Sequence, residues 1–178
     1  SDIDAHTLSA IDLDGTTLKN SSGEVFLATR TASAANPSAN LFSAAAIAGG
    51  TAIAGGVVDA ENRMVGEDAT IQAGDVHLFA GKNAFGAGNL LSGSANSDMA
   101  LVSLAGIGIP EANIEIVETN HIDLLGSTAI EGLKNVDLIT KEGLGGDDRA
   151  QTDGMVTSIS AIPYAMDVSG GGSVTSIN

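Results

Sequence analysis

The sequence predicts an all-β protein in which parallel strands stack as a β-helix, or β-solenoid. Three observations predict this fold. A sequence pattern returns at intervals of about 50 residues, as in repeat proteins that stack one unit on the next. Apolar residues alternate with a period of two, which is the mark of a half-buried strand. No segment combines the apolar spacing of an amphipathic helix with a capping box.

The clearest repeat relates residues 11–30 to residues 122–141 without a gap. Composition alone would give about one or two identities in such a window, so the match indicates a true repeat. The identical pairs are Ile11/Ile122, Asp12/Asp123, Leu13/Leu124, Gly15/Gly126, Thr17/Thr128, Val25/Val136, Leu27/Leu138 and Thr29/Thr140.

A middle copy lies between these two. Residues 23–27 match residues 74–78, and residues 40–43 match residues 89–92, which makes Asn40 and Asn89 equivalent turn or ladder residues. We therefore expect residues 1–178 to form one solenoid domain. Its units are roughly 11–60, 61–113 and 114–178, each made of about two coils of about 20–25 residues, or about eight coils in all.

The strands alternate with segments of small residues. Residues 41–58 contain no charge over 18 positions, which approaches the length of a membrane span. Ala and Gly dominate this run and no cationic flank marks it, so we interpret it as a buried pair of strands. Residues 99–109 alternate in the same way and predict a strand that is apolar on both faces. Residues 142–178 depart from the pattern and are interpreted as a divergent coil or a cap.

The segment 69–80 reads ATIQAGDVHLFA, and residues 17–28 and 129–140 follow its pattern more loosely. This pattern resembles the repeats of filamentous haemagglutinin-like and leukotoxin-type filamentous adhesins, which are large secreted bacterial exoproteins. The resemblance covers about residues 8–140. It implies a right-handed parallel β-helix that is secreted or displayed at the cell surface, and it brings no catalytic residues.

Composition excludes several classes of function. The chain contains seven Lys and Arg residues and 22 Asp and Glu residues, so its net charge is −15. This negative charge argues against nucleic-acid binding and against docking on anionic lipid. The chain has no Cys, which excludes disulfides and thiolate chemistry. Its few aromatic residues do not predict the sugar platforms of a carbohydrate-active β-helix enzyme.

Candidate site residues are few. Asp147 and Asp148 follow two glycines and faintly resemble a calcium-binding repeat, but a solvated acidic loop is the favoured interpretation and calcium binding stays open. His77 should face outward and His121 should lie at a turn, while His6 shares metal-ligand spacing with neither. Arg30, Lys82 and Lys141 follow equivalent strands, which favours a repeated turn position over a substrate groove.

No nucleophile elbow or P-loop is present, and we expect no enzyme activity and no catalytic, cofactor-binding or metal-binding residues. The favoured function is a non-catalytic structural or adhesive module of a secreted or cell-surface bacterial protein. A self-assembling filament or virion subunit is the alternative, and a carbohydrate-active enzyme is less favoured. Expected partners are a glycan or protein at a cell surface and further copies through strand edges, without nucleic acid or membrane insertion.

Overall fold

The computed structural model of the chain describes residues 1–140, 149–165 and 169–177. All regular elements in these residues are strands, so the all-β expectation is confirmed. The strands are β1 (Asp2–Asp12), β2 (Thr17–Thr29), β3 (Ala32–Ala35), β4 (Ser38–Glu67), β5 (Thr70–Ala80), β6 (Leu90–Leu125), β7 (Ala129–Ile139), β8 (Arg149–Ala165) and β9 (Ser169–Ile177).

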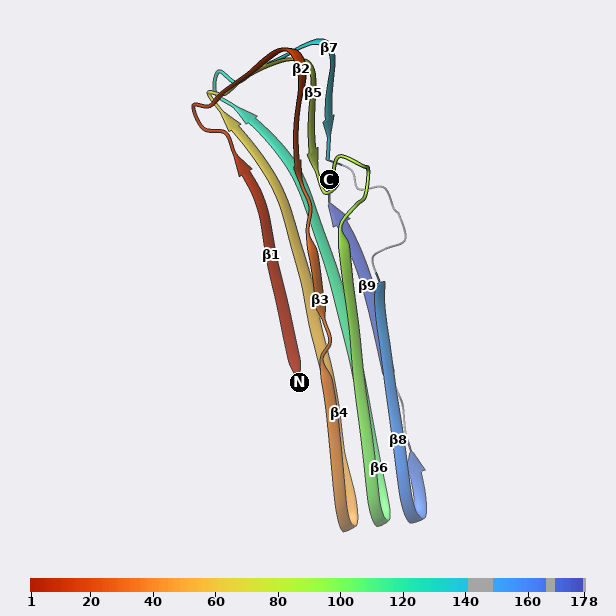
Figure 1. Cartoon of the computed structure of the whole chain (residues 1–178). Coiled ribbons are helices and arrows are strands. Elements are labelled where there is room, and N and C mark those ends of the chain that lie inside the picture. Colours follow the sequence, from red (N-terminus) through yellow and green to blue (C-terminus); the bar gives the residue numbers. More distant parts are fainter. Residues whose placement is uncertain (141–148, 166–168, 178) are drawn as a thin grey trace.

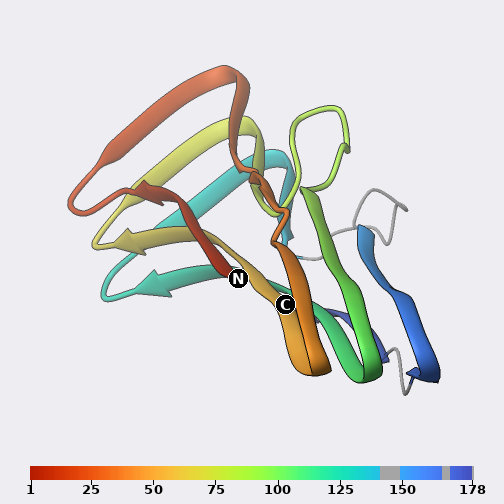
Figure 2. The same ribbon diagram turned by 90° about the horizontal axis from the view of Figure 1, so that it is seen from below.

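The strands form two separate sheets in which the paired strands run parallel. One sheet has the order β1-β4-β6-β3, and β8 and β9 also pair with β6; the other has the order β2-β5-β7. Figures 1 and 2 show successive passes of the chain lying side by side in both sheets. We call each pass a layer: β1 with β2, then β3 to β5, then β6 with β7, then β8 with β9. The expectation of parallel stacked strands is therefore confirmed.

The register identifies one sequence unit with one layer. Ile11 pairs with Met64 and Met64 pairs with Ile122, so two layers span the 111 residues of the sequence repeat. Throughout β4 and β6, paired residues are 58 positions apart, as in Val58 with Ile116. The expected coils of about 20–25 residues, two to a unit, are therefore wrong.

A layer is long because β4 and β6 each bend back on themselves without a turn, as the lower end of Figure 1 shows. Before the bend of β6 the odd-numbered Met99 and Leu101 are buried, whereas after it the even-numbered Ala112 and Ile114 are buried. The pairing omits Leu104, where the inward parity changes. The run carries apolar side chains on both faces, as expected: Met99 and Leu101 are buried, and Val102, Leu104, Ile107 and Ile109 are exposed.

The interior is thin and is filled by small residues facing larger ones. Its buried residues form three clusters: Ala35, Ala54, Val58, Ala60, Leu91, Ala95, Ala112, Ile114 and Ile116; Leu13, Met64, Ala69, Ile71, Ala73, Val76 and Leu78; and Ala48, Ala52, Met99 and Leu101. A Cβ built on Gly93 would lie 2.3 Å from Cγ1 of Ile114, and one on Gly50 would lie 2.5 Å from Cδ2 of Leu41. Glycine at these positions is what allows the two limbs of a bent strand to approach.

A buried polar network joins β4 and β6 to the segments that precede β3 and β6. The Asn62 side-chain amide donates to Asn120 at 2.9 Å, and the Thr31 hydroxyl donates to Asn62 at 3.0 Å. Asn89 accepts from the Thr31 backbone N–H at 2.8 Å, and Asn120 also donates to the buried Glu118 carboxylate. Because buried polar groups are costly when unpaired, this network favours one register of the layers.

The turns between the sheets also stack. Asp68 has a left-handed backbone (φ 52°), and its Oδ1 accepts hydrogen bonds from the backbone N–H and the hydroxyl of Ser127, both at 2.8 Å. These two hydrogen bonds from the next layer lower the pKa of Asp68 below its ordinary value of 3.8. The ionised carboxylate thus favours the folded state.

We expect Asp68→Asn to remove a pH-dependent part of the stability. The folded-state pKa is depressed, so this contribution is present above pH 3.8 and is lost as the pH falls through the folded value. Asn retains an acceptor oxygen and tolerates the left-handed backbone. Urea unfolding from pH 7 to pH 2 should show the stability difference between the two proteins shrinking below pH 3.8. Glu67→Gln leaves the Ser127 hydrogen bonds intact and is the control; a difference independent of pH would contradict the expectation.

Candidate functional site

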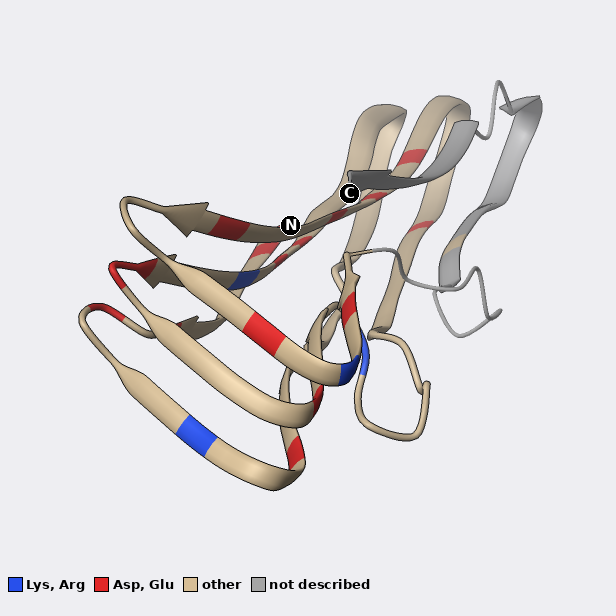
Figure 3. Ribbon diagram, turned by 90° about the horizontal axis from the view of Figure 1, so that it is seen from above, with Lys and Arg blue, Asp and Glu red and all other residues tan. Residues whose placement is uncertain are grey.

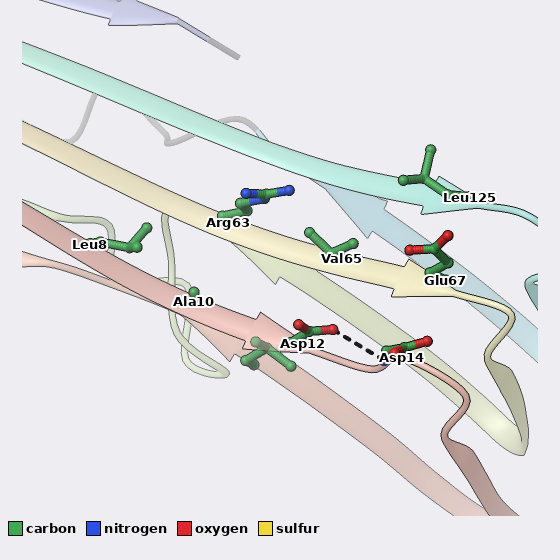
Figure 4. A pocket seen from close by; sticks show the side chains of 9 residues that line it. Leu8, Ala10, Asp12, Asp14, Arg63, Val65, Glu67 and Leu125 are labelled. Atoms are coloured by element: carbon green, nitrogen blue, oxygen red, sulfur yellow. Dashed lines mark hydrogen bonds between the residues drawn. The ribbon is translucent and has the colours of Figure 1, made fainter.

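Two outward-facing surfaces bring charged or aromatic side chains together. The first, which we call the acidic hollow, lies on the outer face of β1 and β4. Figure 4 shows the side chains that line it, on β1, on β4 and at the end of β6. It has a volume of about 300 Å³ and is lined by Leu8, Ala10, Ile11, Asp12, Asp14, Arg63, Val65, Glu67 and Leu125.

Charged side chains beside the acidic hollow pair across neighbouring layers. Nε2 of His121 lies 3.5 Å from a carboxylate oxygen of Glu61 and 3.6 Å from one of Asp123. Arg63 is 3.9 Å from Asp123 through its Nε. These partners come from β4 and β6, whose side chains are brought together by the parallel register. Exposed pairs of this kind contribute little individually, about 0–1 kcal/mol.

The carboxylates that line the hollow are exposed. Asp12 uses Oδ1 to accept the backbone N–H of Asp14 at 3.1 Å, which orders the turn that follows β1. Asp12, Asp14 and Glu67 are all exposed.

The second surface, which we call the aromatic strip, comprises Phe26, His77, Phe79 and Lys82. The Phe26 and Phe79 rings meet edge to face with centroids 5.0 Å apart, and the His77 ring lies 5.9 Å from Phe26. Nζ of Lys82 lies 4.4 Å from the Phe79 centroid, a cation–π contact. Phe26, His77 and Phe79 share one face because alternate residues of β2 and β5 point outward, and Lys82 follows in the loop after β5.

His77 is the centre of this strip. It faces away from the buried Val76 and Leu78, which confirms the predicted orientation. Its Nδ1 lies 2.7 Å from Asp137 on β7, and its Nε2 lies 3.6 Å from Glu24 on β2. The imidazole therefore lies between a carboxylate of the preceding layer and a carboxylate of the following layer.

The other predicted site residues are dispersed. His121 lies within β6, so the expected turn position is wrong, and His6 contacts Asp59 at 3.2 Å. Arg30 donates from Nε to the carbonyl of Gly88 at 2.5 Å, which places its side chain against loop 81–89. Lys82 is part of the same loop. Asp147, Asp148 and Lys141 lie outside the described residues.

The register also corrects one predicted equivalence and reveals residues that the sequence did not single out. Asn40 pairs with Asp98 and is exposed, whereas Asn89 precedes Leu90, which pairs with Ala32. Asn40 and Asn89 are therefore not equivalent, and only Asn89 joins the buried network. The sequence does contain a signal for the contact between Asn62 and Asn120. The two residues are 58 positions apart, and each is followed by a basic or imidazole residue and then by an apolar one.

Among residues 1–140, 149–165 and 169–177, no group of three or more His, Asp or Glu side chains is placed to hold a metal ion. The same residues contain no helix long and apolar enough to cross a membrane. Comparison with protein-family models, with curated proteins and with solved structures finds no match to this chain.

Proposed function

We propose that the chain is a non-catalytic structural or adhesive module, a right-handed β-solenoid of a secreted or cell-surface bacterial protein. One observation carries this proposal: side chains of the same kind recur at the same place in successive layers. Val25, Val76 and Val136 are in register, and so are Leu27, Leu78 and Leu138. Such regular stacking builds an extended surface and does not by itself assemble a reaction centre.

The aromatic strip is the surface that best suits a ligand of an adhesive module. It combines two apolar rings with a cation and with the carboxylates of Glu24 and Asp137, so it presents ring faces beside hydrogen-bonding groups. A sugar has the same combination of apolar C–H faces and hydroxyl groups. We therefore propose that a neutral glycan is the ligand, since the acidic chain would repel an acidic one.

A glycan-array measurement followed by titration tests this function. Phe79→Ala should weaken binding of a neutral glycan about tenfold, which corresponds to about 1.4 kcal/mol of lost contact. Phe42→Ala removes an exposed phenylalanine from a different surface, on β4, and should leave the affinity unchanged. Equal losses in both variants would contradict a site at the strip. Release of new reducing ends from the bound glycan would contradict a non-catalytic module.

A filament subunit is the second candidate, and the outer edge of β7 favours it. Over the described residues no strand pairs with this edge, and Val136 and Leu138 are 43% and 47% exposed, whereas Val76 and Leu78 in β5 are fully buried. An open edge with apolar side chains is a template for another strand. Association that grows with concentration and is abolished by Leu138→Lys would support this candidate; filaments unaffected by that substitution would contradict it.

A further inference from the structure

The bends of β4 and β6 expose an uncharged apolar surface. The outward-facing residues just after each bend form a patch that we call the tip surface. It comprises Ile47, Gly49 and Thr51 on β4, and Ala105, Ile107 and Ile109 on β6. Ile47 is 82% exposed, Ile107 52% and Ile109 43%. Exposed apolar patches of this kind commonly mark interaction sites.

The tip surface differs from the rest of the molecule in having no charged residues. The chain has a net charge of −15, yet residues 41–58 and 99–110 contain no charged residue. Figure 3 shows both bends without the colours of charged side chains, which lie mostly toward the other end of the strands. Two copies of so acidic a chain repel each other at most orientations, and the tip surface is where they meet with least repulsion.

The relief of the tip surface matches a second copy of itself. In each in-register pair, one layer carries a bulky residue and the other a small one: Ile47 pairs with Ala105, Gly49 with Ile107 and Thr51 with Ile109. A two-fold axis parallel to the strands and between the two layers exchanges the layers while keeping positions along the strand. It therefore sets Ile107 of one copy over Gly49 of the other, and Ile47 over Ala105.

We propose that the tip surface is a self-complementary interface at which two copies of this chain form a two-fold dimer. An isologous interface requires each patch to contain its own complement, and the alternation of bulky and small residues provides it. Binding to a lipid surface would not require bulky and small residues to alternate, because a lipid surface has no fixed relief to match. This proposal is independent of glycan binding and of association through the edge of β7.

Sedimentation velocity of the full 178-residue chain over a concentration series tests for the dimer. The unmodified chain should dimerise, and Ile107→Asp should weaken dimerisation at least tenfold by placing a charge against the partner. Leu8→Asp, at an exposed leucine of β1, and Leu138→Asp, at the edge of β7, should leave the dimer unchanged. A monomer at all concentrations, or equal loss in all three variants, would overturn the proposal.

Cross-linking tests the geometry, because the chain has no native cysteine. Gly49→Cys and Ile107→Cys are made as separate variants; a Cβ at Gly49 would lie no closer than 3.4 Å to its nearest neighbour. Mixed and oxidised, the two variants should cross-link to each other at least tenfold more than either does to itself. Preferential cross-linking within either variant would overturn the two-fold arrangement. Co-sedimentation of a monomeric chain with phosphatidylcholine vesicles would instead assign the tip surface to lipid.

Discussion

Replacing Val76 with Asp should lower the free energy of unfolding by about 3–5 kcal/mol, because it places an unpaired carboxylate in the apolar interior. Val76 is fully buried and lies between Val25 and Val136 in neighbouring layers. The carboxylate would have no water around it and would contact the apolar side chains of the cluster that includes Ile71 and Leu78. Urea unfolding monitored by circular dichroism measures the loss.

His77→Gln, one residue along the same strand, is the matched control. Glutamine keeps a hydrogen-bonding group toward Asp137 and remains on the outer face, so the expected change is below about 1 kcal/mol. His77→Asp is a poorer control, because the new carboxylate would face Glu24 and Asp137. Equal unfolding curves for Val76→Asp and His77→Gln would show that the inward and outward faces of β5 are wrongly assigned.

Replacing Gly93 with Val should destabilise the chain by about 1–3 kcal/mol, the usual effect of overpacking an interior. A Cβ at this position would lie 2.3 Å from Cγ1 and 2.9 Å from Cδ1 of Ile114, which is itself fully buried. The two limbs of β6 would have to separate to accept the added atoms. Thermal unfolding of the variant measures the effect.

Ser94→Val introduces the same residue one position later, on the exposed face of the same strand. Valine suits a β-strand, so this variant should be as stable as the unmodified chain within about 0.5 kcal/mol. Because both variants introduce the same β-branched residue into β6, their difference isolates the contact with Ile114. A Gly93→Val protein as stable as Ser94→Val would contradict the close approach of the limbs.

The sequence predicted the features that depend on local alternation and on repetition. Period-two alternation correctly placed Val76 inside and His77 outside. The 111-residue repeat correctly related Val25 to Val136, because the strands of successive layers are held in fixed register. Both features follow from strand geometry, in which one residue of slip would move every side chain to the other face.

The size of a layer could not be predicted in this way, because no turn motif marks the bends. The chain changes direction at Leu104, which has no partner in the pairing of β4 with β6, and the buried residues change there from odd-numbered to even-numbered. The surrounding sequence is nevertheless a continuous apolar run. The buried network was missed for a related reason. Asn62 and Asn120 share only a short local pattern, and their contact depends on the 58-residue register that the layer size determines.

Intrachain disulfide formation tests the one-unit, one-layer arrangement most directly. Gln72 and Glu131 are in register on β5 and β7, and their side chains meet at 2.8 Å. Neighbouring parallel strands are about 4.8 Å apart, within the range that a disulfide can span. The double variant Gln72→Cys/Glu131→Cys should therefore oxidise to an intrachain disulfide, whereas Gln72→Cys/Ser94→Cys should remain reduced. Coils of about 20–25 residues would bring positions 72 and 94 together and hold 72 and 131 about 10 Å apart, so the reverse result would contradict the account.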